Sequence, residues 1–107
     1  MTICVPVTPD GQVDGSWGRA ARVAVVRVDD GLITGWEQHD VRWDELHDVG
    51  APGGHHARIA RFLLEQGVTL VLAGHMGPPM VQMLGKMGIE MRLGLTGDAR
   101  LAVAGAG

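Results

Sequence analysis

The sequence predicts an α/β domain with a mixed five-stranded sheet and helices packed on it. Three observations favour this fold class. Short β-branched runs alternate with segments of helical periodicity, Asp30-Gly31 marks a tight hairpin turn, and glycines punctuate the segment ends. The inferred order is β-β-β-α-β-α-β-α, in which an antiparallel meander precedes two βα units. A chain of 107 residues has the usual size of one domain, so we expect a single domain over residues 1–107.

The first half of the chain predicts three strands. T-I-C-V-P-V at residues 2–7 is a short β-branched run, and a polar, glycine-bearing loop follows at residues 8–18. R-V-A-V-V-R-V-D at residues 22–29 indicates a second strand, and Asp30-Gly31 turns the chain into a third strand at residues 32–40. This third strand is a candidate sheet edge, through which a homodimer can form.

In the second half, helical and strand patterns alternate. Ile59, Ala60, Leu63 and Leu64 recur at helical spacing, and Gly67 occupies the position of a C-cap glycine. V-T-L-V-L-A is an uninterrupted apolar run, as in a strand covered on both faces. The expected elements are a loop at 41–54, a helix at 55–66, a strand at 68–73, a loop at 74–78, a helix at 79–87, a strand at 89–93, and a terminal helix from Asp98 whose last residues, A-G-A-G, fray.

Composition and charge exclude several classes of function. The net charge of −3 and the single lysine, Lys86, leave no basic stripe, so we expect no nucleic-acid partner. The single cysteine, Cys4, cannot form an internal disulfide or hold an iron–sulfur cluster alone. No apolar run approaches the roughly 18 residues of a membrane span, and the N-terminus lacks the pattern of a secretion signal. We therefore expect a cytoplasmic protein with no membrane partner.

Four short motifs, in this order along the chain, resemble the dinitrogenase iron–molybdenum cofactor biosynthesis family, the NifX/NafY-like domains. They are I-C-V-P-V with its following Asp-Gly loop, S-W-G-R-A at 16–20, G-G-H-H at 53–56 leading to V-T-L-V-L-A-G-H-M-G-P at 68–78, and M-G-I-E-M-R-L-G at 87–94. The resemblance covers nearly the whole chain. Two departures stand out: family members often carry His-Phe-Gly where this chain has Ser16-Trp17-Gly18, and commonly a run of glycines where it has His75 and Met76.

The resemblance implies a fold and a function. The fold is a three-layer ribonuclease H-like arrangement of one NifX/NafY-like domain. The function is a non-catalytic carrier or binding domain for an iron–sulfur or molybdenum-containing cluster, or for its precursor. The implied partners are the metal cluster itself and a protein that donates or accepts the cofactor, with the domain acting as a monomer or a homodimer.

Two segments carry the candidate metal ligands. His55 and His56 open the helix at 55–66, where free N–H groups attract anions, and imidazole binds iron, copper and zinc. The alternative is that one histidine of the pair caps or packs while the other is solvated. His75 and Met76 follow the strand at 68–73, at a carboxyl strand end where open α/β sheets bind ligands. The expected pocket has Gly53, Gly54, Gly74 and Gly77 as its floor, Trp17 and Arg19 beside it, and residues 94–97 as a third wall.

Two other functions stay open on the residues alone. One is a soft-metal module that binds Cu(I) at His75 and Met76, because thioethers suit Cu(I). Met80, Met83 and Met87, by contrast, fall at helical spacing and predict core packing. The other is a protein-interaction or regulatory domain with a vestigial pocket. The chain lacks a G-x-S-x-G elbow, a Walker loop and an acidic residue in its first strand, so we expect no enzyme.

Overall fold

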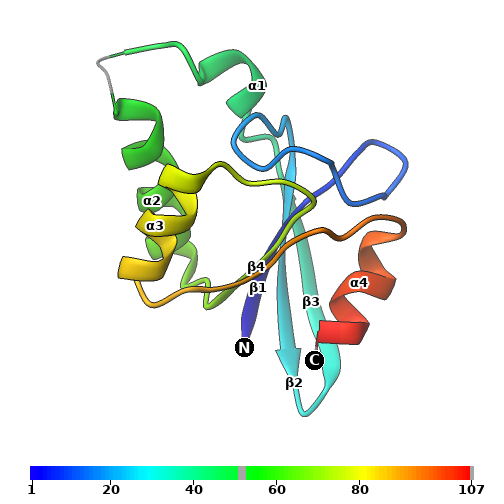
Figure 1. Ribbon diagram of the computed structural model, residues 1–107. Helices are drawn as coiled ribbons and strands as arrows, with labels where there is room; N and C mark the ends of the chain where they lie inside the picture. Colours follow the sequence, from blue (N-terminus) through cyan, green and yellow to red (C-terminus); the bar gives the residue numbers. More distant parts are fainter. Residues whose placement is uncertain (51–52, 107) are drawn as a thin grey trace.

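The computed structural model describes residues 1–50 and 53–106, and it arranges them in three layers (Figure 1). A five-stranded sheet separates the helices α2 and α3 on one face from α4 on the other. This confirms the predicted fold class. The strands are β1 (Thr2–Pro6), β2 (Val23–Asp29), β3 (Leu32–His39), β4 (Leu70–Leu72) and β5 (Glu90–Arg92), and the helices are α1 (Trp43–Leu46), α2 (Gly54–Gln66), α3 (Pro78–Lys86) and α4 (Ala99–Ala106).

The order of the strands in the sheet is β3-β2-β1-β4-β5, and their directions place the loops of the site together at one end of the strands. β2 runs antiparallel to both β1 and β3, whereas β4 runs parallel to β1 and β5 runs parallel to β4. β1, β3, β4 and β5 therefore all point the same way. Their carboxyl ends meet at one edge of the sheet, and the segments that follow them gather there, at the top of Figure 1.

Alternation along the strands builds a separate core on each face of the sheet. Cys4 and Val71 face α2 and α3, where they pack with Ile59, Leu63 and Leu84. Their neighbours in the chain face the opposite way and pack against Ala99 and Val103 of α4, as expected where successive side chains point to opposite faces. Residues on the α4 side include Ile3, Val5, Ala24, Val26, Leu70 and Leu72.

Turn and cap residues behave as the sequence predicts. Asp30 and Gly31 both adopt positive φ, 51° and 76°, which is the geometry of a two-residue hairpin turn between β2 and β3. Gly67 ends α2 with φ 69°, and its N–H donates to the carbonyls of Leu63 and Leu64. The methionine stripe also packs as predicted: Met80 is buried in the core, and Met83 and Met87 pack against it.

The structure differs from the sequence interpretation in two places. The connection at 41–54 is not all loop, because Trp43–Leu46 forms one helical turn, α1. Trp43 is buried there, edge-to-face against Trp17 with ring centroids 5.1 Å apart, and this packing fixes the turn. The terminal helix continues to Ala106, so it includes three of the four residues that the sequence predicts to fray. Residues 51–52 of the connection, and Gly107, lie outside the described residues.

Over the described ranges, no helix is long and apolar enough to cross a membrane.

Candidate functional site

Backbone hydrogen bonds join three loops at the carboxyl edge of the sheet. The Trp17 N–H donates to the His75 carbonyl at 3.1 Å, and the His75 N–H donates to the Gly15 carbonyl at 3.1 Å. The Gly94 N–H donates to the Gly74 carbonyl at 2.8 Å. These bonds link the segments after β1, β4 and β5, and we call the joined backbone of residues 15–17, 74–75 and 94–97 the platform. The bonds hold the platform in one arrangement beside the site.

A surface depression of about 310 Å³ lies where the N-termini of α2 and α3 meet the loop that carries Trp17. From α2 it takes His55 and His56, whose backbone lies in a first turn with no side-chain cap. The N-terminus of a helix carries a partial positive charge, so this position favours anions. The full lining is Trp17, Gly18, Arg19, His47, Asp48, His55, His56, Gly77, Pro79 and Met80.

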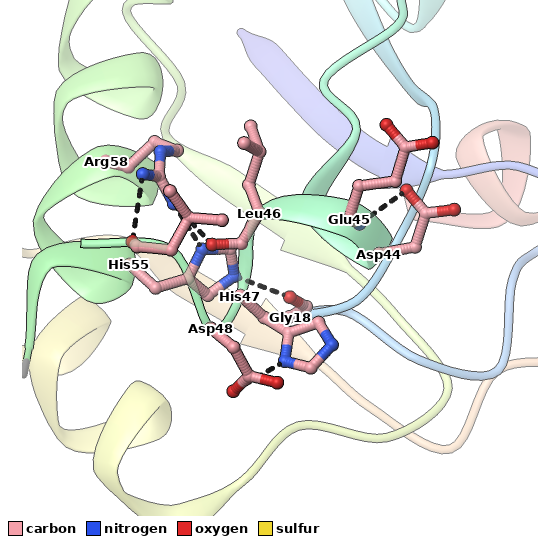
Figure 2. A network of polar contacts seen from close by, with 9 residues as sticks. Gly18, Asp44, Glu45, Leu46, His47, Asp48, His55 and Arg58 are labelled. Atoms are coloured by element: carbon pink, nitrogen blue, oxygen red, sulfur yellow. Dashed lines mark hydrogen bonds and ion pairs between the residues drawn. The ribbon is translucent and has the colours of Figure 1, made fainter.

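His55 uses both of its ring nitrogens inside the protein (Figure 2). Its Nε2 lies 2.7 Å from the Gly18 carbonyl oxygen, which can only accept, so Nε2 carries the hydrogen. Its Nδ1 lies 2.9 Å from Nη1 of Arg58, which can only donate, so Nδ1 accepts. With neither nitrogen available, His55 is a scaffold residue in this structure. This matches the alternative in which one histidine of the pair packs.

His56 and His47 also line the depression, and neither has both of its ring nitrogens occupied as His55 does. His56 follows His55 on α2 and is half-buried, and in the described part of the chain its ring makes no hydrogen bond. His47 is half-buried just after α1, and its Nδ1 lies 3.2 Å from a carboxylate oxygen of Asp48. Arg19 on the opposite wall is exposed and supplies the positive charge that an anion would need.

The structure does not bring His75 and Met76 into this depression. His75 is exposed on the neighbouring platform, where its backbone pairs with Ser16. Met76 is only 6% exposed and packs in the core beneath α2 and α3, because the bridge at His75 turns the next side chain inward. The two residues are therefore not among those that line the depression with His56 and Arg19.

The four glycines predicted to form the floor of the pocket do not lie there together. Gly77 alone of the four lines the depression, as the N-cap residue of α3. Gly53 caps α2 with φ 81°, a backbone conformation that favours glycine, and Gly54 is the first residue of that helix. Gly74 lies where three backbones meet, since an added Cβ would stand 3.1 Å from the Cα of Gly15 and 3.3 Å from the Leu95 carbonyl oxygen. Residues 94–97 are part of the platform and do not form a wall of the depression.

Sequence reasoning missed His47, Asp48, Gly18, Pro79 and Met80 as lining residues. His47 and Asp48 sit in a polar stretch with no motif, and only the fold of α1 brings them to α2. The sequence predicts Met80 in the core, and it is buried there while also lining the depression. Gly18 could have been found from its neighbours Trp17 and Arg19.

The donor set suits contact with a bound anion better than chelation of a bare ion. Across residues 1–50 and 53–106, no three His, Cys, Asp or Glu side chains are grouped so as to hold a metal ion. The indole Nε1 of Trp17 is buried and, among the described residues, has no hydrogen-bond acceptor. A buried donor without a partner is costly. Because Trp17 has no exposed surface, this N–H is not itself open to a ligand in the depression.

The sequence matches the family described as "Dinitrogenase iron-molybdenum cofactor" over residues 1–105. The chain belongs to that family. Two solved structures share its fold: one of a protein designated PH0822 and one of the apo form of the orange protein from Desulfovibrio gigas. The alignment with PH0822 has a TM-score of 0.80 and 18% identity, and it covers 99% of this chain and 88% of the PH0822 chain. The orange protein aligns with a TM-score of 0.76 at 27% identity, covering 95% of this chain and 82% of its own. No curated protein matches the chain.

Family membership links the chain to iron–molybdenum cofactor chemistry and to no particular cluster.

Proposed function

We propose that this domain binds and carries an anionic metal–sulfur cluster, or a precursor of one, in the depression between α2 and α3, and does not transform it. The observation that carries the proposal is the lining itself. Two helix N-termini, Arg19 and the imidazoles of His47 and His56 converge on one depression in a member of a cofactor family. The orange protein, a relative of the same fold, has been solved in an apo form, which supports a binding role.

The chemistry of the lining favours cargo that is anionic and already assembled. A cluster with sulfide or oxo groups on its surface can accept hydrogen bonds from the backbone N–H groups of α2 and a charge-assisted contact from Arg19. One or two imidazoles can then ligate an exposed metal corner. Because no group of three ligands is present among the described residues, the protein contributes only part of the coordination, and the cargo can leave intact.

The test is an anaerobic titration of the apo-protein with tetrathiomolybdate, Fe(II) and Cu(I), each separately. Trp17 lines the depression and packs against Trp43, so binding should quench tryptophan fluorescence, while elemental analysis after gel filtration counts bound metal. We expect saturable binding of tetrathiomolybdate, which His56→Ala weakens by roughly tenfold if one contact to a charged group is lost.

His75→Ala is the matched control, because it removes an imidazole from the neighbouring platform without touching the depression. Binding that is lost in His75→Ala and kept in His56→Ala would move the site to the platform and contradict the proposal. Saturable uptake of Cu(I) alone would favour the soft-metal module. No uptake of any of the three would leave a protein-interaction domain as the better account.

A further inference from the structure

Arg58 on α2 ties the segment after α1 to the helix (Figure 2). Its Nη1 donates to the Leu46 carbonyl at 2.9 Å and also lies 2.9 Å from the His55 ring. Its Nη2 donates to the Val49 carbonyl at 3.4 Å. A planar guanidinium with several fixed donors can hold two carbonyls and a ring at once, whereas a lysine ammonium has no such fork.

His55 extends this clamp to the opposite wall of the depression. Since Nδ1 accepts from Arg58, the ring is fixed in the form in which Nε2–H donates to the Gly18 carbonyl. Gly18 and His55 are 37 positions apart in the chain. Two side chains, Arg58 and His55, thus connect residues 46–49, α2 and the Trp17 loop.

Among the described residues, few other contacts hold residues 46–49 in place. Val49 is 52% exposed, and the ring of His47 lies edge-on to that of His55 with centroids 6.4 Å apart. The other backbone hydrogen bonds of the segment are local, from the N–H groups of Leu46, His47 and Val49 to the carbonyls of Arg42, Trp43 and Leu46. A segment with few buried apolar contacts opens at low cost, so its position depends on its polar contacts. His47 and Asp48 lie inside this segment and line the depression, whereas Arg58 does not line it.

We propose that Arg58 is a positioning residue: through Leu46, Val49 and His55 it sets the gap between the two walls of the depression and places His47 for the cargo. This inference rests on the proposed function. It assigns His55 to the frame of the site, and it makes affinity depend on a residue that does not touch the cargo. Breaking a hydrogen bond of Arg58 lets residues 46–49 leave this position part of the time, but it removes no group that contacts the cargo. We therefore expect binding that is weaker but still measurable.

The experiment compares Arg58→Lys with Arg61→Lys. Both substitutions keep the charge on the same helix. Arg61 is exposed one turn further on, where its side chain makes no hydrogen bond within the described residues. We expect Arg58→Lys to weaken tetrathiomolybdate binding roughly tenfold, as for the loss of one or two hydrogen bonds, and Arg61→Lys to leave it unchanged.

Two further readouts separate positioning from general damage. Nitrogen-15 NMR of the His55 ring should show the single Nε2–H form in the wild type and in Arg61→Lys, and exchange between forms in Arg58→Lys. A double-mutant cycle should show that Arg58→Lys costs much less in a His47→Ala background, because its effect passes through His47. Strict additivity with His47→Ala would overturn the inference.

The outcomes distinguish this inference from the proposed function. If the wild type binds and Arg58→Lys binds equally well, the positioning role is wrong and the proposed function stands. If the wild type does not bind tetrathiomolybdate, Fe(II) or Cu(I), the proposed function fails, and the positioning role fails with it.

Discussion

Replacing Gly74 with alanine tests the tightest contact at the carboxyl edge of the sheet. An added Cβ would stand 3.1 Å from the Cα of Gly15, 3.2 Å from its carbonyl oxygen and 3.3 Å from that of Leu95. Carbon atoms pack best at about 3.5–4.0 Å, so the carbon–carbon contact is roughly 0.4 Å too short. All three neighbours are backbone atoms, and the hydrogen bonds from His75 to Gly15 and from Leu95 to Ala73 prevent them from moving independently.

We expect Gly74→Ala to lower the free energy of unfolding by about 1–3 kcal/mol, the usual cost of forcing an extra carbon into a packed site. For a domain of this size each kcal/mol corresponds to a fall of about 4–8 °C in Tm. The assay is urea unfolding followed by tryptophan fluorescence, with the slope m compared between variants so that a lower midpoint can be assigned to stability.

Gly85→Ala is the control for this prediction. Gly85 lies near the end of α3 with no atom within 4 Å of an added Cβ, so alanine there should be neutral or stabilise by up to about 0.5–1 kcal/mol. If Gly74→Ala unfolds at the same urea concentration as the wild type, or a higher one, the three loops are not packed as closely as the distances state. The explanation of Gly74 as a close-approach residue would then be wrong.

Three further predictions concern the two cores. Leu63→Ala should cost about 2–5 kcal/mol because Leu63 is fully buried, and Leu64→Ala, at 69% exposed, should cost little, both measured by urea unfolding. Burial raises the pKa of the Cys4 thiol, so a thiol reagent should modify it only on unfolding; stability should fall as pH rises above about 9, where only the unfolded thiol ionises. Rapid labelling of the native protein would contradict this. Arg100→Ala should cost about 0.5–1 kcal/mol and change Trp36 emission, because the guanidinium stacks 4.4 Å above that ring; an unchanged emission would argue against the stack.

Much of the fold follows from local signals in the sequence. Asp30-Gly31 specifies a turn with two positive φ angles, and Gly67 specifies a left-handed cap, because few other residues adopt these conformations cheaply. The periodicity of Met80, Met83 and Met87 specifies which face of α3 is buried. These predictions succeed because each depends on one residue's backbone preference or on one helix's own spacing.

The composition of the site depended on contacts between distant segments, which the sequence does not show. His75 lies beside a strand end, as predicted, but a backbone bridge to Ser16 directs Met76 into the core. His47 enters the site because Trp43 packs beneath Trp17 and Arg58 holds the carbonyls of Leu46 and Val49. No local pattern distinguishes Arg58 from Arg61, since both lie on α2 and only the fold brings acceptors to one of them.

The histidine pair shows why neighbouring residues on a helix take different roles. Successive side chains on an α-helix point about 100° apart, so His55 and His56 leave α2 in different directions, although both line the depression. His55 turns toward Gly18 and Arg58 and is consumed by the frame, which leaves His56 as the imidazole of α2 available to a ligand. In the carrier role that we propose, a fixed frame would keep the depression open before the cargo arrives, and a small number of protein ligands would let the cargo depart. The affinity of the site should therefore be more sensitive to Arg58, which shapes it, than to His75, which the sequence alone would have placed in it.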